Sequence, residues 1–381
     1  MQGGLLPLRF ERAYNSESLV AGPFGYGWTH SYNTWLSIAP PDGARVYLYT
    51  HDGAVLRFDQ QPDGSYTAAP GVHRTLVKEP DGSWTLRLRN GVVQRFAVVA
   101  SPYPGGLKGR LTAIVDRHGN QVSLNYNPNG DLATIADVAG RLLSFSYDAQ
   151  HRITQLVDPL GRTFAYQYSI KGDLASVTYP DSTQALYSYV YHQMVYHNDP
   201  WAPAGQAQVS YSYDVPGRGR VIQVIYPDGG QETVSYGVGS AVYSDRLGRT
   251  RTVVTDAQSN VTNVTFASSR SLVAGGAARQ PAASSQTRSY GYDAQHNVTS
   301  AVDANGHTTT YTYDANGNIT SATDPTGHTA SYTWNLTTNR LLQATDRLGR
   351  TTTYAYNGQG DLVSVMDAAG GVTSYSYAGC C

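Results

Sequence analysis

The chain contains 381 residues with a formal net charge of −1, 14% charged residues, 39 glycines and 30 tyrosines. This balance gives no support to a basic surface for nucleic acid or an anionic membrane, and no apolar segment reaches the length of a membrane span. A chain of this length can bury a sizeable core, and its many turn residues and tyrosines predict an all-β protein.

Residues 1–110 are predicted to form an antiparallel β domain. Hairpin signals of the Pro-Asp-Gly, Asp-Gly and Asn-Gly type recur through this part of the chain, and they separate short runs with strand-like alternation. The turn signals are Pro41-Asp42-Gly43, Asp52-Gly53, Pro62-Asp63-Gly64, Pro80-Asp81-Gly82 and Asn90-Gly91. The predicted strands are Arg45–Tyr49, Ala54–Phe58, Trp84–Arg89 and Val92–Val98.

Residues 111–381 are predicted to form a repeat array with a period of about 21 residues. Its mark is a pair of aromatic residues two positions apart, which the alternation of a strand places on one face. The pairs are Phe145/Tyr147, Tyr166/Tyr168, Tyr187/Tyr189, Tyr211/Tyr213, Tyr290/Tyr292, Tyr311/Tyr313, Tyr332/Trp334, Tyr354/Tyr356 and Tyr375/Tyr377.

Each repeat is predicted to contain two short strands and two turns. An Asp followed three residues later by Gly opens each unit, because Asp accepts backbone hydrogen bonds in a turn and Gly adopts a positive φ without strain. Thr308–Tyr313 and Ile319–Thr323 illustrate the two strands of one unit. A sheet of well over ten twisted strands must curl or close, so the array is expected to form a curved, open β-shell.

Two insertions interrupt the period and are predicted to be surface loops. The first, His192–Gln208, contains two prolines around Trp201, and the second, Ser268–Gln286, is rich in Ala, Gly and Ser. The adjacent Cys380 and Cys381 have no other cysteine to pair with, and we expect neither redox nor metal chemistry from them.

No metal or cofactor site is predicted. Asp314, Asn316 and Asn318 alternate as calcium ligands would, yet no Glu follows at the distance that an EF-hand needs, so a turn is the better interpretation. His192 and His197 lack a neighbouring cysteine or carboxylate cluster. The remaining candidates, His30, His51 and His73, are scattered among turn residues without a nucleophile nearby.

No catalytic residue is predicted either. A glycosidase needs two opposed carboxylates, one with a raised pKa. Asp303, Asp324 and Asp346 recur with the repeat at turns, where water is expected to keep them ordinary acids.

Two sets of motifs resemble the RHS/YD-repeat family of bacterial polymorphic toxins and toxin-complex proteins. Tyr311–Ile319 reads Tyr-x-Tyr-Asp-x-x-Gly-Asn-Ile and Asp346–Arg350 reads Asp-x-x-Gly-Arg. Leu6–Asn15 and Gly22–Tyr32 resemble the domain that precedes the repeats in bacterial members. The resemblance implies a hollow shell around a C-terminal toxin, with toxin cargo and a secretion apparatus as partners.

The family's cleavage core and toxin domain are not visible in this sequence. Asp158-Pro159-Leu160-Gly161 and Asp324-Pro325-Thr326-Gly327 resemble part of the cleavage motif only superficially, since each falls on the ordinary repeat Asp. The chain is therefore expected to be an internal fragment or a degenerate reading frame. Met1–Pro7 lacks the features of a signal peptide, and the localisation is not predicted.

The leading functional hypothesis is a non-enzymatic structural module, the front part of a shell that encapsulates and delivers a toxin. The alternatives are a surface that binds carbohydrate or a neighbouring cell through exposed tyrosines, and a glycoside hydrolase that uses the repeat aspartates. An unpaired strand edge near Tyr375–Tyr377 is also expected to promote self-association.

Overall fold

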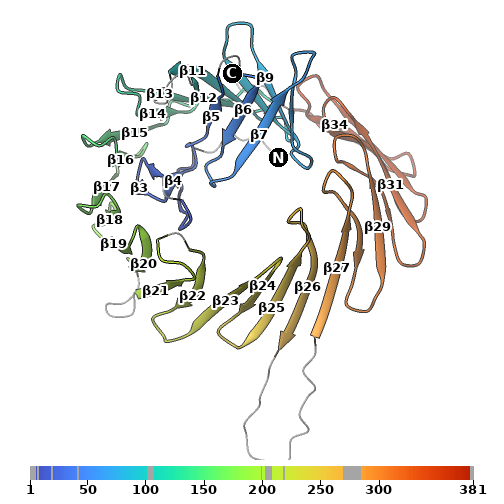
Figure 1. Cartoon of the computed structure of the whole chain (residues 1–381). Helices are drawn as coiled ribbons and strands as arrows, with labels where there is room; N and C mark the ends of the chain where they lie inside the picture. The colour runs from blue at the N-terminus through green and yellow to red at the C-terminus, as the bar shows by residue number, and fades with distance from the viewer. Residues whose placement is uncertain are drawn as a thin grey trace, which may run out of the picture.

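The computed structural model describes residues 6, 8–18, 20–40, 43–100, 107–198, 200–201, 208–217, 219–268 and 285–377. Its regular elements are strands, joined in antiparallel ladders that follow one another around a ring (Figure 1). Within these residues, no helix has the length and apolarity needed to cross a membrane. The all-β, curved architecture predicted from the sequence is confirmed.

The first strands belong to a short N-terminal segment and to a barrel. The strands are β1 (Arg12–Tyr14), β2 (Ala21–Gly22), β3 (Gly25–Tyr26), β4 (Trp28–His30), β5 (Trp35–Ile38), β6 (Arg45–Tyr49), β7 (Val55–Gln60), β8 (Tyr66–Ala68), β9 (Arg74–Lys78), β10 (Trp84–Leu88), β11 (Val93–Ala100) and β12 (Leu107–Val115). The strands predicted in this part of the chain are present as β6, β7, β10 and β11 with small differences at their ends.

The remaining strands follow the repeat. They are β13 (Gln121–Tyr126), β14 (Leu132–Ala136), β15 (Leu142–Tyr147), β16 (Ile153–Val157), β17 (Thr163–Tyr168), β18 (Leu174–Thr178), β19 (Gln184–Val190), β20 (Gln193–Asn198), β21 (Gln208–Tyr213), β22 (Val221–Ile225), β23 (Gln231–Gly237), β24 (Ser240–Ser244), β25 (Arg249–Thr255), β26 (Val261–Ser268), β27 (Ser285–Tyr292), β28 (Val298–Val302), β29 (Thr308–Tyr313), β30 (Ile319–Thr323), β31 (Thr329–Asn335), β32 (Arg340–Thr345), β33 (Thr351–Tyr356), β34 (Leu362–Met366) and β35 (Val372–Ser374).

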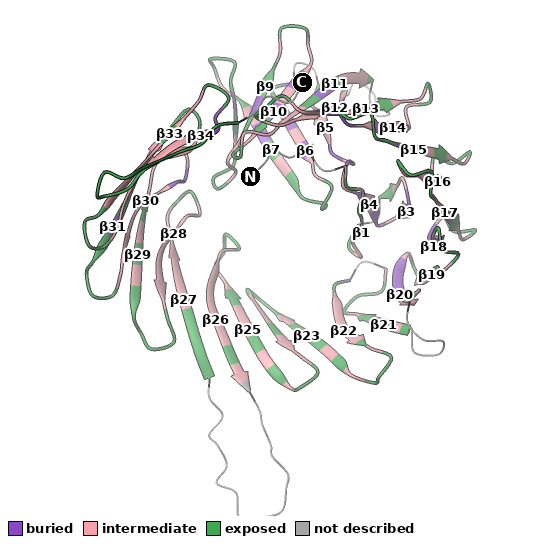
Figure 2. Cartoon of the chain, turned by 180° about the vertical axis from the view of Figure 1, so that it is seen from behind, coloured by how far each residue is buried: buried purple, intermediate pink, exposed green. Residues whose placement is uncertain are grey.

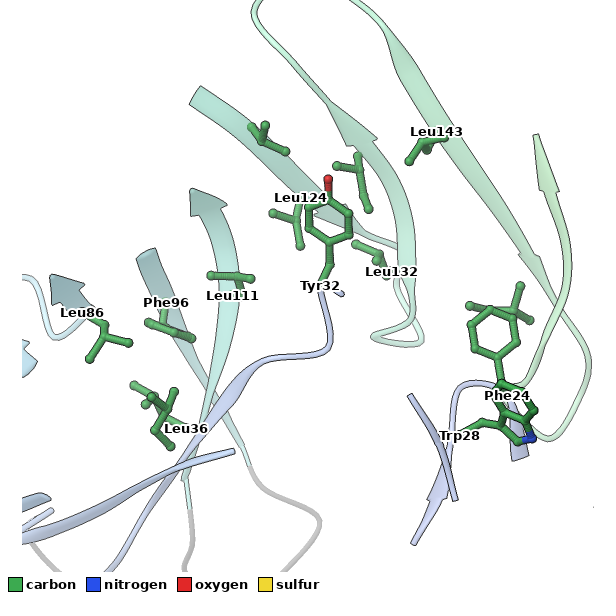
Figure 3. Packing of buried hydrophobic residues seen from close by; sticks show 14 of the residues in the cluster. Phe24, Trp28, Tyr32, Leu36, Leu86, Phe96, Leu111, Leu124, Leu132 and Leu143 are labelled. Atoms are coloured by element: carbon green, nitrogen blue, oxygen red, sulfur yellow. The ribbon is translucent and has the colours of Figure 1, made fainter. Parts of the chain in front are cut away.

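Strands β5 to β12 close into a barrel because β12 pairs with β11 along one edge and divides its other edge between two strands. Its first half, Leu107–Arg110, pairs with β5, and its second half, Ala113–Val115, pairs with β13. The predicted domain boundary at residue 110 therefore falls inside a strand that the barrel and the array share. Large side chains fill the barrel, and Figure 3 shows Leu36, Leu86, Phe96 and Leu111 among them.

The repeat turns have the predicted chemistry. In the turn after β16, Asp158 Oδ1 accepts hydrogen bonds from the backbone N–H groups of Leu160 and Arg162 at 2.9 and 3.0 Å, and Arg162 Nε donates to Asp158 Oδ2 at 2.7 Å. Gly161 closes the turn with φ 76°. These bonds, with the guanidinium of Arg162, hold the pKa of the Asp158 carboxyl below its usual value against the opposing effect of desolvation, which is the largest single influence. Each such Asp is therefore a structural anion.

The second aromatic residue of most pairs makes a bond that the sequence interpretation missed. Its hydroxyl donates to a backbone carbonyl oxygen at the start of the preceding strand, typically 15 residues earlier, as Tyr313 does to Val298 at 2.7 Å. Where tryptophan replaces tyrosine, Trp334 Nε1 donates to the Ile319 carbonyl at 2.7 Å. The same bond is made by Tyr126, Tyr147, Tyr168, Tyr236, Tyr356 and Tyr377. We call this bond the latch.

The latch predicts that the two tyrosines of a pair respond differently to loss of the hydroxyl. Tyr313→Phe leaves the Val298 carbonyl without its partner and is expected to destabilise the fold by about 1 kcal/mol. Tyr311→Phe, two residues away on the same face, removes a hydroxyl that makes no latch and is expected to cost less than about 0.5 kcal/mol. Urea unfolding of the two variants measures the difference, and equal losses would contradict a special role for the second position.

The prediction of a loop over His192–Gln208 was wrong in its first half. Gln193–Asn198 forms β20, which pairs with both β19 and β21. Residues Gln193–Asn198 alternate as in a strand. They lack an aromatic pair at the spacing found in the other repeats, and the strand was therefore not predicted. Residues 202–207 lie outside the described part, as do residues 269–284 of the second predicted insertion and the pair Cys380 and Cys381.

The end of the array returns to the barrel, and turns from the two regions meet along a seam. Arg89, in the turn between β10 and β11, donates from Nη2 to the Gly317 carbonyl at 2.9 Å and to Asn318 Oδ1 at 2.5 Å. In the turn after β12, His118 Nε2 lies 3.3 Å from the buried Asp361 carboxylate. These contacts join parts of the chain more than 200 residues apart, so the ring is completed at the seam by side chains.

A glycine at the seam gives a matched pair of variants. Gly317 and Gly327 both have positive φ, 75° and 89°, but a Cβ on Gly317 would collide with the His73 ring, whereas a Cβ on Gly327 would meet open space. Gly327→Ala is expected to cost about 1 kcal/mol from backbone strain alone, and Gly317→Ala clearly more. Hydrogen exchange at residues 71–90 should rise only in Gly317→Ala, and His73→Ala should suppress that rise. Equal behaviour of the two glycine variants would show that the seam contributes little.

The predicted self-association concerns the outer edge of the last strand, β35. β35 pairs with β34, and the register of pairing links it to no other described strand. Its three residues are exposed, as are Tyr375 and Tyr377. Self-association through this edge stays a prediction.

Candidate functional site on the tyrosine face

The continuous sheet has two chemically different faces. One carries the aromatic pairs and is called the tyrosine face. The opposite face, in the later repeats, carries threonine and serine hydroxyls that bond across neighbouring strands, as Thr323 and Thr329 do at 2.8 Å and Thr345 and Thr351 at 2.9 Å. In β29 the threonines at the alternate positions are exposed, while Tyr311 and Tyr313 are half-buried. The two faces therefore offer different surfaces to a partner.

In the first half of the array, an N-terminal segment covers the tyrosine face. This segment, residues 8–18 and 20–32, contains β1 to β4 and lies inside the ring against β15 to β20 (Figures 1 and 2). Phe24 is fully buried, with its ring 4.8 Å from the Tyr166 ring, and Phe10 lies 5.2 Å from Phe145. A backbone bond from Ile153 N–H to the Pro23 carbonyl, 2.8 Å, fixes the segment to the wall. In this half, the aromatic pairs are therefore packing units between the wall and the segment.

Arg12 sits in a cage of aromatic rings at this interface. Its guanidinium carbon lies 5.2 Å from the Trp28 ring, 5.3 Å from the Tyr166 ring and 5.7 Å from the Phe24 ring. Cations are attracted to the faces of aromatic rings, most strongly where water is excluded. Arg12 Nη1 is buried and has no hydrogen-bond partner among the described residues. The cage therefore holds this part of the guanidinium through the rings rather than by a salt bridge.

Hydrogen bonds fix the position of the segment further along the wall. Trp28 Nε1 donates to the Tyr189 hydroxyl at 2.8 Å. The Tyr14 hydroxyl donates to the His192 carbonyl at 2.8 Å and accepts from the Met194 N–H at 2.9 Å. Burial raises the pKa of Tyr14 to about 12, so its hydroxyl stays protonated across the physiological range. The wall therefore binds the N-terminal segment through ring packing and through hydrogen bonds to its polar groups.

His30 makes this packing sensitive to acid. It is 3% exposed, stacks on Phe10 at 5.1 Å, and its Nδ1 accepts a hydrogen bond from the Tyr32 N–H at 3.3 Å. Burial lowers the pKa of His30 to about 3. The folded-state pKa of His30 lies below that of the unfolded chain. The contribution of neutral His30 to folding stability is therefore complete above pH 6.5 and is lost as the pH falls toward the folded-state pKa.

We therefore expect the N-terminal segment to loosen in mild acid. At pH 4.5 the loss from His30 alone amounts to about 3 kcal/mol. Hydrogen exchange of residues 8–32 should accelerate between pH 7 and pH 4.5, after correction for the intrinsic rate, and His30→Leu should remove most of that change. An unchanged protection in the native protein would contradict a neutral, buried His30.

The second half of the array has the same aromatic pairs, and none of the described segments covers them as residues 8–18 and 20–32 cover the first half. Among the described residues, no aromatic ring or cation contacts Tyr290, Tyr311, Tyr332 or Tyr354 within the distances seen around Arg12 and Phe24. The residue across the ladder is also smaller for the first three of these tyrosines, whereas Val365 lies opposite Tyr354. Ala322 lies opposite Tyr311 where Val177 lies opposite Tyr166. A shallow depression results, lined by Ala322, Ala330, Tyr332 and Ala344.

The aspartates considered for glycosidase chemistry are turn residues in the structure. Asp303 accepts from the His307 N–H, Asp324 from the Thr326 hydroxyl, and Asp346 from the Arg350 N–H. In each case this bond is the largest cause that lowers the pKa of the carboxyl. A general acid requires the opposite shift.

The residues considered for metal binding are also engaged in other ways. Asn318 Nδ2 donates to Asp314 Oδ2 at 2.9 Å, as in a repeat turn. His192 Nδ1 bonds to Asp173 at 2.7 Å, and His197 Nδ1 to the Tyr211 hydroxyl at 3.1 Å. No group of three or more His, Cys, Asp or Glu side chains within the described ranges could hold a metal ion.

Two functional features were missed from the sequence. The latch could have been found, because the second member of every pair is Tyr or Trp, both hydrogen-bond donors, whereas the first member includes Phe145. The cage around Arg12 was missed because its wall ring, Tyr166, is distant in the chain, and nothing in the sequence pairs it with the nearby Phe24 and Trp28.

Comparisons with known proteins agree with this architecture. A family model described as RHS Repeat matches residues 126–163, 147–184, 282–308, 292–329 and 334–371, and one described as Domain of unknown function (DUF6531) matches residues 1–58. No curated protein matches the sequence.

A search of solved structures returns three matches of low similarity among others. They are TcdB2-TccC3 without its hypervariable C-terminal region (TM-score 0.48, 11% identity, 85% of this chain and 21% of that chain), TcdB2-TccC3 (0.44, 12%, 95% and 24%) and the Tc holotoxin pore of Photorhabdus luminescens (0.39, 10%, 85% and 22%). This chain therefore spans less than a quarter of the length of those chains.

Proposed function

This chain is an RHS-repeat protein, and we propose that its curved sheet forms part of a shell whose tyrosine face encloses a polypeptide cargo, a toxin in the intact protein. The structural role of the sheet follows from its repeat architecture. Encapsulation goes one step further than this structural role. It assigns the binding of cargo to the tyrosine face of the sheet rather than to the turns or to the opposite face.

One observation carries the proposal. The N-terminal segment already lies inside the ring, where the tyrosine face buries it through rings, a caged guanidinium and backbone bonds. The same sheet can therefore hold a polypeptide on its inner side. Cross-strand pairs and latches each contribute on the order of 0.2–1 kcal/mol, so the wall gains its stability from many repeated units.

Protease protection tests the proposal. An unstructured reporter polypeptide fused to the C-terminus of the full chain is expected to be cleaved at least tenfold more slowly than the free reporter. The seam variant Gly317→Ala should reduce that protection, whereas Gly327→Ala should retain most of it. Cleavage of the fused reporter at the free rate would refute encapsulation by this chain.

Carbohydrate binding is a second candidate function, because no described segment covers the tyrosines of β27 to β34. Aromatic rings on a β surface can stack against sugars, and Tyr311 and Tyr332 are half-buried rather than fully covered. Saturable binding to a glycan, lost in Tyr311→Ala but not in Thr310→Ala on the opposite face, would favour this function over encapsulation.

A further inference from the structure

We propose that the tyrosine face of β27 to β34 is the docking site for an extended polypeptide segment of the cargo in which aromatic residues alternate with arginine. This inference rests on the proposed function and deepens it by naming the part of the wall and the chemistry of the chain that it accepts.

The N-terminal segment provides the precedent on the same face of the same sheet. In β1 and the residue two before it, Phe10, Arg12 and Tyr14 stand at alternate positions, and each meets an aromatic ring of the wall. The rings they meet are members of the aromatic pairs in β15, β17 and β19. An alternating aromatic and cationic strand is therefore a ligand that these repeats already bind.

The later repeats have the same recognition groups with more room. Tyr311 and Tyr332 occupy the positions of Tyr166 in their units, and alanines replace the larger residues across the ladder. Beside Tyr332 lies a depression that Ala322, Ala330 and Ala344 line, with Asp346, Asp367, Arg347 and Arg350 at its charged side. The incoming segment must supply the side chains that Phe24 and Trp28 supply in the first half.

Charge favours arginine in the incoming segment. Between Tyr290 and the turn after β34, residues 290–367 contain seven aspartates and three arginines, a net charge of −4. The aspartates are Asp293, Asp303, Asp314, Asp324, Asp346, Asp361 and Asp367, and the arginines are Arg340, Arg347 and Arg350. A cationic segment is attracted to this surface, and the half-buried tyrosine rings then bind its guanidinium groups.

A peptide with the sequence of residues 8–16, Leu-Arg-Phe-Glu-Arg-Ala-Tyr-Asn-Ser, serves as the probe. Labelled at one end, it is expected to bind the full chain saturably by fluorescence anisotropy. Hydrogen exchange should show new protection in β27 to β34. A peptide with R12Q and F10A should bind at least tenfold more weakly, because it lacks the cation and one ring.

Variants of the wall make the test specific. The double variant Tyr311→Ala and Tyr332→Ala should weaken binding at least tenfold. The matched double variant Thr310→Ala and Thr333→Ala, on the opposite face of the same strands, should change it less than twofold. Circular dichroism confirms that both fold.

Three outcomes would overturn the inference: no saturable binding, binding indifferent to the two tyrosines, or new protection at β15 to β19 instead, which would mean that the probe displaces the N-terminal segment. If any of these is observed while the fused reporter is still protected from protease, the docking site is rejected and the proposed shell function is kept. Loss of reporter protection removes the proposed function itself.

Discussion

Raising the pH above 10 is expected to unfold this protein cooperatively. Burial raises the pKa of Tyr166 to about 12, and it also raises the pKa values of the latch tyrosines Tyr126, Tyr147 and Tyr168. The ordinary value is 10. A phenolate cannot donate the latch bond, so ionisation and loss of the repeat structure are coupled.

The sign of the effect follows from linkage. Because the folded-state pKa lies above that of the unfolded chain, the unfolded chain releases the phenolic proton first. The stabilisation is complete below pH 10 and is lost as the pH rises through the folded-state pKa. For Tyr166 alone, which is 6% exposed, the two-unit shift corresponds to about 3 kcal/mol at pH 12. Several such residues together exceed the stability of a typical domain.

Two signals measured in one titration check this. Absorbance at 295 nm reports tyrosinate, and circular dichroism near 218 nm reports the sheet. The buried tyrosines should ionise together with loss of the sheet signal, and Tyr166→Phe should move the midpoint upward, whereas Tyr375→Phe, at an exposed position, should not. Complete ionisation near pH 10 with an intact sheet would contradict the burial of the latches.

The second large effect is expected from Phe24→Ala. The Phe24 ring is 0% exposed and packs against Tyr166 and the Arg12 guanidinium. Removing it leaves a cavity at the interface between the N-terminal segment and the wall, and a buried phenylalanine replaced by alanine costs about 3–5 kcal/mol. Arg12 would then lose one ring of its cage while remaining buried, which adds to the loss.

A phenylalanine outside this interface provides the control. Phe266 is 44% exposed, so Phe266→Ala should cost less than about 1 kcal/mol in urea unfolding. Hydrogen exchange should rise over residues 8–32 and over β15 to β19 in Phe24→Ala, but not in β27 to β34. Comparable losses in the two variants would show that the N-terminal segment is only loosely attached to the wall.

These two effects concern the same surface. In the first half of the array, a segment of the chain packs on the tyrosine face, and the proposed docking site uses the equivalent tyrosines of the second half. Stability measurements on Phe24 and binding measurements on Tyr311 therefore examine one mode of recognition at two places in the ring.

Local chemistry made much of the fold predictable. Asp158 and Gly161 form the turn that their spacing indicated, and Thr308–Tyr313 and Ile319–Thr323 are strands with the predicted bounds. Such features depend on a few neighbouring residues, whose preferences decide the outcome. The strand at Gln193–Asn198 was missed because its aromatic spacing departs from the repeat.

The sequence by itself determined the all-β class, the repeat unit, its turns and the shared face of each aromatic pair, because these follow from contacts between residues close along the chain. Only the tertiary structure decided that β12 pairs with β5, that Arg89 reaches Gly317, and that the segment around Arg12 covers one half of the tyrosine face. Those contacts join residues from 69 to more than 200 positions apart. These contacts depend on the total twist and curvature of many strands, which cannot be derived from any short stretch of sequence.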